Sequence, residues 1–242
     1  MRKYYGSMEA IDYRRAVLNV TRVTLFTEGE SGEYTHADFS LYSGQLALVL
    51  LQNMHQSASL ADAFSGLLRP AKGSVLFFGR DWQHASADTA NAMRGKIGRV
   101  FSSSNWLDGF SLADNILLSQ RHHTRRPKEE LLQEAAHLAK EFSLPGLPTG
   151  YPNEYTPEDR RRAACVRAFL GRSSLLLLEE PTLGVYPRIM ASLVNAVRRV
   201  RNRGGAVFWM TLSEEIWRDD SIPADRLFRL SGRELLEVSR KA

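Results

Sequence analysis

The chain has 242 residues, of which 43% are hydrophobic, and a formal net charge of +5. This length predicts one large domain or one domain with an inserted lobe, and the composition can supply a sizeable core. Its apolar runs are too short to cross a bilayer, and its basic start lacks the apolar region of a secretory signal. Because Cys165 is the single cysteine, an intrachain disulfide is excluded. We therefore expect a cytosolic protein, or one on the cytosolic side of a membrane.

The basic residues are scattered or fall on predicted helices. One predicted helix carries Arg160, Arg161, Arg162 and Arg167, and another carries Arg198, Arg199, Arg201 and Arg203. A solvated helix face or a face against a partner accounts for such a pattern, and no nucleic-acid-binding motif accompanies it. We expect no nucleic acid partner.

The N-terminal part of the chain is β-rich. Short, partly alternating stretches predict strands at 16–20, 22–26 and 36–42, broken by turn residues at 27–34. A buried strand is predicted at 44–52, a helix at 57–68, a turn at 70–73 and a strand at 74–79. Strand, loop, helix, turn and strand thus follow one another.

The middle of the chain changes from strand to helix. A buried strand at 97–102 precedes helical spacing at 111–118 and 128–142. After the Pro- and Gly-rich segment 143–152, Thr156 is the expected N-cap of a helix at 156–171, with Pro157 at its first position. These helices predict a lobe inserted into a sheet domain.

The remainder alternates strands and helices. The apolar run at 174–180 predicts a buried strand that carries Glu179 and Glu180 at its carboxyl end, where open α/β sheets hold ligands. A helix at 187–204, a strand at 206–211, a helix at 213–219 and strands at 226–230 and 234–238 are predicted to follow.

The order of these elements resembles the ATP-binding cassette (ABC) ATPase domain from about Ala16 to Val238. Four phrases carry the resemblance in the family's order: FSGLLRPAKGSVLFFGRD, IGRVFSSSNWLDGFSLADNILL, RRRAACVRAFLGRSSLLLLEEPT and PADRLFRLSGRELLE. The resemblance implies an α/β, P-loop NTPase-like fold with a mixed central sheet and an N-terminal antiparallel β-subdomain. It also implies a single domain over 1–242 with an inserted helical subdomain at about 111–172.

The P-loop positions depart from the family's pattern. A P-loop needs glycines so that backbone N–H groups can wrap the phosphates, a lysine for their charge and a hydroxyl for Mg²⁺. Here Leu51 and Gln56 stand at the two glycine positions, and Ser57 stands at the lysine position. Ala58 stands at the position of the Mg²⁺-binding hydroxyl and is followed by Ser59. We expect weak or no Mg-ATP binding and no other cofactor, because no cation offsets the phosphate charges.

The other nucleotide motifs differ as well. Ser102 stands at the Q-loop glutamine, Tyr186 at the D-loop aspartate, Leu212 at the switch histidine, and the LSGGQ signature is matched by residues 155–159. Thr156 retains a hydroxyl at the position of the signature serine. Residual binding of a nucleotide at the P-loop of a partner therefore stays an open alternative. Glu179 matches the Mg²⁺-binding position and Glu180 the general base. A general base acts only on a water molecule held against a bound phosphate. We therefore favour the interpretation that the two glutamates are hydrogen-bond acceptors at the end of a strand in an inherited fold.

This resemblance implies that the chain is a non-catalytic subunit of a membrane ABC transporter, paired with itself or with an active ATPase. It would dock on a permease from the cytoplasmic side of the inner or plasma membrane. The expected permease contact comprises Ser104, Trp106, Leu107 and Phe110. Packing of Trp106 and Phe110 under the helical lobe is the alternative for those two residues.

The segment PTLGVYP resembles the D-loop of the Mla/MCE lipid-transport ATPases, which implies a lipid as the transported substrate. Two other functions stay open. One is an ATPase that binds nucleotide through an unusual loop. The other is a soluble regulatory pseudo-ATPase.

Overall fold

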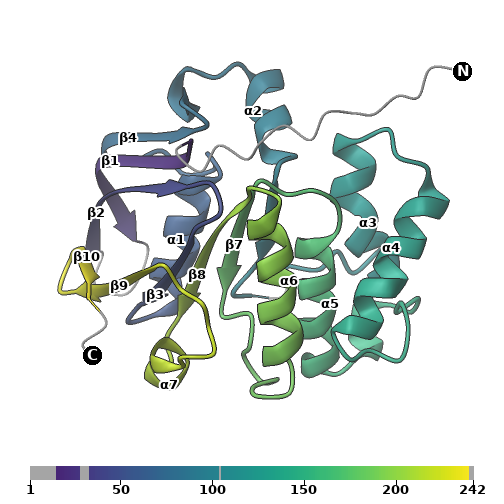
Figure 1. The fold of residues 1–242 in the computed structure, drawn as a ribbon. Helices are drawn as coiled ribbons and strands as arrows, with labels where there is room; N and C mark the ends of the chain where they lie inside the picture. Colours follow the sequence, from purple (N-terminus) through teal and green to yellow (C-terminus); the bar gives the residue numbers. More distant parts are fainter. Residues whose placement is uncertain (1–14, 28–32, 104, 240–242) are drawn as a thin grey trace, which may run out of the picture.

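The computed structural model describes residues 15–27, 33–103 and 105–239 of the chain (Figure 1). In this part of the chain the strands form one ten-stranded sheet in the order β5-β4-β1-β2-β10-β9-β3-β8-β7-β6. The strands are β1 (Ala16–Thr27), β2 (Glu33–Tyr42), β3 (Leu46–Leu50), β4 (Lys72–Phe77), β5 (Arg80–Asp81), β6 (Ile97–Val100), β7 (Leu175–Glu179), β8 (Ala206–Thr211), β9 (Arg226–Ser231) and β10 (Glu234–Val238).

The sheet has a parallel half and a mainly antiparallel half. Strands β9, β3, β8, β7 and β6 pair in parallel, whereas β1 pairs antiparallel with both β2 and β4. The antiparallel β9–β10 pair joins the halves, because β10 also pairs with β2. The predicted α/β class, the mixed sheet and the antiparallel N-terminal strands are confirmed.

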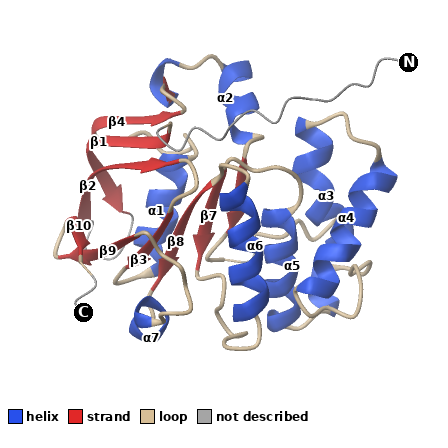
Figure 2. Ribbon diagram, viewed as in Figure 1, coloured by secondary structure: helices blue, strands red, loops and turns tan. Residues whose placement is uncertain are grey.

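Helices cover both faces of the parallel strands (Figure 2). Helix α1 packs on the face shared with β1 and β2, and α3, α4, α5 and α6 gather on the other. The helices are α1 (Met54–Phe64), α2 (Ala87–Arg94), α3 (Leu112–His123), α4 (Lys128–Glu141), α5 (Pro157–Phe169), α6 (Met190–Asn202) and α7 (Glu214–Arg218), with 3-10 turns at Trp82–His84 and Pro152–Glu154. None of the described helices is both long enough and apolar enough to span a bilayer.

The leucine run of β7 is explained by this two-sided burial. Successive side chains of a strand point to opposite faces. Leu175 and Leu177 belong to the cluster beneath α1, while Leu176 and Leu178 belong to the cluster beneath the other helices. A parallel strand covered on both faces therefore needs a continuous apolar run rather than an alternating one.

Several predicted boundaries differ from the structure. The stretches at 16–20 and 22–26 form one strand, β1, whose pairing with β2 shifts register between Val20 and Val23. Helix α1 begins three residues before the predicted position because Asn53 caps it, and α6 begins at Met190 instead of 187. Strand β5 and helix α2 have no counterpart in the prediction. Both are short, so their sequence periodicity is weak.

Phe208, at the centre of β8, links the sheet to α1 and β2. Its ring is fully buried, stacks on Phe39 at 5.4 Å between centroids and meets Phe64 edge-on at 5.1 Å. We predict that Phe208→Ala lowers the free energy of unfolding by about 3–5 kcal/mol, through lost burial and the cavity left behind. Urea denaturation measures this loss. Leu236→Ala on β10, where the side chain is 48% exposed, is the control and should change stability by less than about 0.5 kcal/mol.

Candidate functional site

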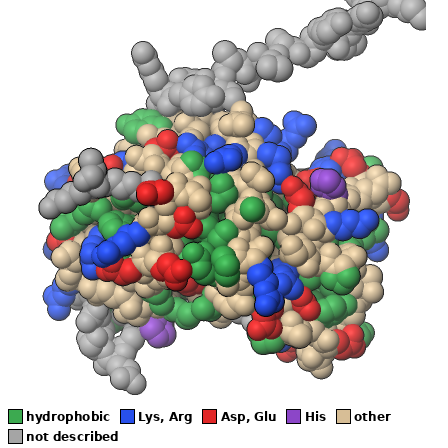
Figure 3. Space-filling model, turned by 60° about the horizontal axis from the view of Figure 1, so that its bottom comes forward, with side chains coloured by type: hydrophobic (Ala, Val, Ile, Leu, Met, Phe, Trp, Pro, Cys, Tyr) green, Lys and Arg blue, Asp and Glu red, His purple; other side chains and the backbone are tan. Residues whose placement is uncertain are grey.

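The carboxyl ends of the parallel strands bring the candidate residues to one edge of the sheet. Helix α7, which follows β8, lies at the lower edge of the molecule in Figure 1, so the parallel strands end there. Figure 3 turns this edge toward the reader and shows acidic, basic and hydrophobic side chains interspersed across it. Among the residues that the structure describes, the basic side chains on this face do not gather into one positive patch of the kind that attracts phosphate.

The start of α1 forms hydrogen bonds within the protein where a P-loop would offer its N–H groups. The backbone N–H groups of Gln52 and Asn53 donate to Oε1 of Gln56, at 3.0 and 3.2 Å. The N–H of Gln56 donates in turn to Oδ1 of Asn53, at 3.0 Å, which completes a capping box. N–H groups at such a strand–helix junction bind anions in P-loop proteins. Here the side-chain oxygen of Gln56 takes the place of an anion.

The remaining P-loop positions provide no phosphate or metal ligand. Leu51, Gln56 and Ser57 are buried, and the Ser57 hydroxyl donates to the carbonyl of Met54 at 2.8 Å. Ala58 lacks a hydroxyl, and both Ala58 and Ser59 lie within the helix. With only three residues between β3 and α1, this segment is too short to wrap a chain of phosphates.

Glu179, at the Mg²⁺ position, is fully buried and paired with an arginine. Nε of Arg99 on β6 lies 2.6 Å from Glu179 Oε1, and the N–H of Ser102 donates to Oε2 at 3.2 Å. Arg99 also reaches Asp62 of α1, with Nη1 2.5 Å from Oδ1. The guanidinium therefore fills the cation position, and its charge opposes a nearby Mg²⁺ ion. This donor set does not fit magnesium.

Glu180, at the general-base position, is held by the protein as well. The backbone N–H of Leu212, the residue at the switch-histidine position, donates to Glu180 Oε1. Burial raises the pKa of the Glu180 carboxyl, against the opposing effects of hydrogen bonds from Leu212 and Thr211 and the charge of Arg161. The favoured interpretation of the two glutamates as strand-end acceptors agrees with these contacts.

The signature position forms an ordinary helix start. Thr156 is the N-cap of α5 as predicted, and its Oγ1 accepts the N–H of Asp159 at 3.1 Å. Glu158 and Asp159 lie in the first turn, and Asp159 pairs with Arg162 at 2.7 Å. The N-terminal end of α5 therefore carries carboxylates, and their negative charge disfavours the approach of a phosphate.

The predicted permease contact is partly exposed. Leu107 and Phe110 are 47% and 48% exposed, whereas Trp106 is half-buried and packs on the core beneath α3–α6. Ser104 lies outside the described residues. The loop that carries Leu107 and Phe110 is fixed by buried Asn115, whose side chain bonds the backbone of both residues. The alternative of packing under the lobe holds in part for Trp106 and not for Phe110.

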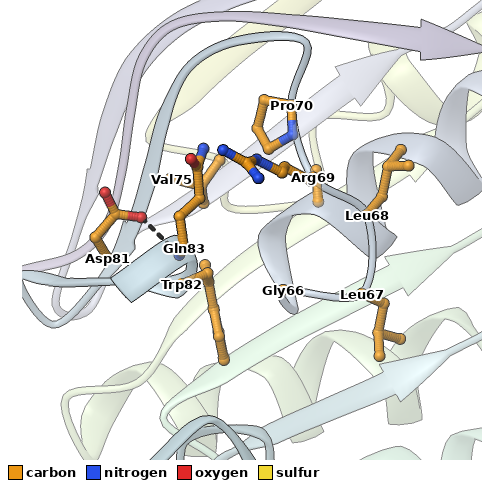
Figure 4. Close-up of a pocket in the computed structure, with 10 residues that line it drawn as sticks. Gly66, Leu67, Leu68, Arg69, Pro70, Val75, Asp81, Trp82 and Gln83 are labelled. Atoms are coloured by element: carbon orange, nitrogen blue, oxygen red, sulfur yellow. Dashed lines mark hydrogen bonds between the residues drawn. The ribbon is translucent and has the colours of Figure 1, made fainter. Parts of the chain in front are cut away.

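A cavity of about 230 Å³ lies away from these positions, beside the end of α1 (Figure 4). Trp82 and Gln83 on the turn after β5 line it together with Gly66 and Leu67, and Asp81 Oδ1 accepts the N–H of Gln83. The Trp82 ring stacks on Phe77 at 5.9 Å and leaves no room for a Cβ atom at Gly66. None of the nucleotide-motif positions lines this cavity. It is a product of hairpin packing on α1.

Comparison with known proteins identifies the family. Residues 35–183 match the family model described as ABC transporter, and this segment includes the P-loop positions, Thr156, Glu179 and Glu180. The chain belongs to the ABC transporter ATPase family. The dimeric cassette MJ0796 bound to ADP and Pi has the same fold, with a TM-score of 0.77, 18% identity and coverage of 93% of this chain and 99% of the other.

Related ABC proteins serve different systems. The chain is 25% identical over 175 residues to the intermembrane phospholipid transport ATP-binding protein MlaF of Haemophilus influenzae, covering 72% of this chain and 66% of that protein. It is 31% identical over 184 residues to the sulfate/thiosulfate import ATP-binding protein CysA of Caulobacter vibrioides, covering 74% and 53%. The chain thus spans between half and two thirds of these two curated relatives, and 35% of the thiamine-import relative YkoD of Bacillus subtilis.

Sequence reasoning missed Arg99, Asn53 and Asn115 as determinants of this site. An arginine inside the otherwise apolar predicted strand at 97–102 was the available signal, because a buried arginine needs a carboxylate partner. The neighbouring strand that ends in Glu179 supplies that partner. The sequence alone does not show that the two strands are adjacent.

The Arg99–Glu179 pair gives a stability prediction. Arg99→Met should lower the free energy of unfolding by about 3–5 kcal/mol, because it leaves a buried carboxylate without its cation. Adding Glu179→Leu should restore most of this loss, since the unpaired charge is then removed. Chemical denaturation of both variants measures the effect, with Arg125→Met at an exposed arginine as the control. Equal losses in the single and double variants would contradict the proposed role of the pair.

The raised pKa of Glu180 gives a pH prediction. The unfolded chain loses this proton near the ordinary carboxyl pKa of about 4.5, and the folded chain loses it at higher pH. Stability therefore falls as the pH rises from the unfolded pKa through the folded one. Glu180→Gln removes this loss and keeps an acceptor for Leu212. The variant should gain stability relative to the parent as the pH increases, and denaturation at acidic and neutral pH tests this. Glu158→Gln, at an exposed site, should show no such trend.

Proposed function

We propose that this chain is a non-catalytic ATP-binding-cassette subunit of a membrane ABC transporter. One observation carries the proposal: side-chain oxygens of Gln56 and Asn53 accept the N–H groups of Gln52, Asn53 and Gln56 at the P-loop position, and Arg99 pairs with the carboxylate that would bind magnesium. Side chains of the protein itself thus contact the positions that would hold the phosphates and the Mg²⁺ ion of a bound nucleotide. The remaining role of such a domain is to bind other proteins.

The partners follow from the family and from the exposed surface. ABC ATPases pair with each other and dock on membrane permeases, and a solved relative of this fold is a dimeric cassette. In the proposal the chain pairs with itself or with an active ATPase, and Leu107 and Phe110 contact a permease at the cytoplasmic side of the membrane. Their exposure supports this contact, since exposed large apolar side chains on one loop mark interaction surfaces.

A lipid is the substrate class that we propose for the assembled transporter. The similarity to MlaF, named for intermembrane phospholipid transport, and the D-loop-like segment PTLGVYP support it. Other relatives are named for sulfate and thiamine-related import, so the substrate is decided by the partners that the chain assembles with.

The decisive experiment isolates the chain with its partners. The tagged chain is expressed in its native cell, the membranes are solubilised gently, and copurifying proteins are identified by mass spectrometry. A multi-span permease, with or without an intact ATPase, is the expected result. Recovery of soluble partners alone, with no chain in the membrane fraction, would replace the proposal with a soluble regulatory pseudo-ATPase.

A nucleotide-binding test addresses the catalytic alternative. Millimolar Mg-ATP should leave the melting temperature of the chain unchanged, because side-chain oxygens already accept the N–H groups of Gln52, Asn53 and Gln56, and Arg99 already pairs with Glu179. A site with a Kd one hundredfold below the ligand concentration would instead add about 2.7 kcal/mol of stability. Differential scanning calorimetry distinguishes the two outcomes.

The matched variant for this test is Gln56→Gly with Ser57→Lys and Ala58→Ser, which frees the N–H groups and restores a cation and a hydroxyl. Any shift with Mg-ATP should be larger in this variant than in the parent. A clear shift in the parent chain, accompanied by phosphate release, would establish an active ATPase with an unusual loop.

A further inference from the structure

Another cavity lies at the amino ends of the parallel strands, at the edge of the sheet opposite the nucleotide-motif positions. Its volume is about 480 Å³, which is within the range of small-molecule sites. Lys96 and Ser174, the residues directly before β6 and β7, both line it. Helix α2 contributes Thr89, Ala92 and Met93, and Figure 1 shows α2 and β4 at the upper edge of the molecule, away from α7. None of the nucleotide-motif positions lines this cavity.

The charged side chains that line the cavity are all basic. They are Arg15, Arg80 and Lys96, and each of these residues is exposed. Within the described part of the chain none of the three pairs with a carboxylate, whereas exposed Arg218 pairs with Glu214 at 2.6 Å. Like charges that share one cavity repel each other, and an anion bound among them relieves this repulsion. The cavity therefore has the charge of an anion-binding site.

The wall of the cavity combines hydroxyl groups with apolar surface. The carbonyl of Lys96 accepts the N–H of Ser174 at 2.8 Å, which joins the starts of β6 and β7. Thr89 and Ser174 each bring a hydroxyl group, and Phe77 and Met93, both buried, are apolar parts of the lining. Polar donors beside apolar side chains suit a ligand with an anionic group on an apolar body.

Phe78 lines the same cavity from a backbone position that disfavours it. It is the first of the two residues that join β4 to β5, and its φ of +49° is followed by +75° at Gly79. Hairpin loops with positive φ at both residues favour Asn, Asp or Gly at the first, because a bulky side chain is disfavoured there. The Phe78 ring meets Phe77 at 4.8 Å between centroids, and the Arg15 guanidinium lies 4.5 Å from its centroid. An aromatic ring kept at such a position, in contact with a cation of the cavity, indicates a role for the ring in the site.

We propose that this cavity binds a small soluble phosphate ester with an apolar or aromatic body. The guanidinium of Arg80 and the ammonium of Lys96 pair with the phosphate, while Phe78 and Ala92 contact the body. A phosphate monoester carries nearly two negative charges at neutral pH, so it offsets several cations better than a carboxylate does. Because the site lies at the other edge of the sheet, this inference does not depend on the proposed function.

Titration of the full chain with phenyl phosphate, followed by NMR, tests the site directly. We expect saturable binding with a dissociation constant of about 1 mM or lower. The backbone amide signals of Thr89, Ala92 and Ser174 should shift, and benzyl alcohol, which lacks the charge, should leave them unchanged. Absence of saturable binding, or shifts confined to residues 52–56 at the P-loop position, would overturn the inference.

Substitution of the cations measures their contribution. Arg80→Met and Lys96→Met should each raise the dissociation constant for phenyl phosphate by about tenfold or more, because each removes a charge-assisted hydrogen bond. Arg233→Met, which removes an exposed arginine after β9 at the other edge of the sheet, should leave it within about twofold. Unchanged affinity in both Arg80→Met and Lys96→Met would contradict the proposed site.

A matched pair of variants at Ala92 separates charge from size. Ala92 is exposed on α2 and lines the cavity, so a longer side chain is tolerated there without loss of core packing. Ala92→Glu places a carboxylate among the cations and should abolish binding of phenyl phosphate, whereas Ala92→Gln should keep it within about threefold, since the two side chains have nearly the same size and helix propensity. Equal affinities of the two variants would contradict an anion-binding site.

Lipid headgroups carry the same phosphate chemistry, and vesicles distinguish that source. At physiological salt the chain should not sediment with phosphatidylcholine vesicles that contain phosphatidic acid, because the proposed ligand is soluble. Sedimentation that is absent with pure phosphatidylcholine and abolished by Ala92→Glu, without binding of phenyl phosphate, would replace the soluble ester with a lipid headgroup.

Discussion

The burial of Glu179 at the end of β7 is the constraint on which the rest of this site depends. An ionised carboxylate with no exposed surface needs an opposite charge and hydrogen-bond donors. Arg99 supplies the charge from the adjacent strand β6, and the chain directly after that strand supplies the N–H of Ser102. Because Arg99 also reaches Asp62, one guanidinium connects β6, β7 and α1. The ion pair that stabilises this edge of the sheet is also the feature that leaves no place for a metal.

The start of α1 has the complementary requirement: its polar groups are N–H donors that need acceptors, whereas Glu179 is an acceptor that needs donors. A helix that begins at the end of a parallel strand exposes N–H groups that need an acceptor. Gln56 provides that acceptor from within the helix, so the fold is complete without an anion. An amide oxygen and a guanidinium together satisfy the polar groups that a Mg-nucleotide would otherwise satisfy. The ABC architecture, including its buried strands β3, β7 and β8, thus has these polar groups satisfied from within the protein.

The lobe formed by α3, α4 and α5 shows a different balance. Asn115 fixes the loop after β6, because its amide nitrogen lies within hydrogen-bond distance of the carbonyls of Leu107 and Phe110 and its amide oxygen accepts the N–H of Leu107. Leu107 and Phe110 are therefore held in place on the surface. Arg167 lies beneath the same loop with donors unused among the described residues. The nucleotide positions are thus closed by internal contacts, whereas the surface next to the lobe combines fixed apolar side chains with an incomplete polar group. Internal contacts therefore satisfy the polar groups at the strand ends more completely than the polar group beneath the lobe.

The sequence by itself determined most of the fold, because the signals involved are local. Continuous apolar runs predicted β7 and β8, helical spacing and caps predicted α3, α4 and α5, and the missing glycines and lysine at 51–59 predicted a failed P-loop. Only the tertiary structure decided which side chains satisfy the polar groups at the strand ends. Arg99 and Glu179 are 80 residues apart in the chain and meet because β6 and β7 pair in parallel. Arg167, Phe101 and Trp106 likewise converge from α5 and a loop that precedes the lobe. Local patterns carry no information on which distant strands become neighbours, and the identity of a buried partner depends on that pairing alone.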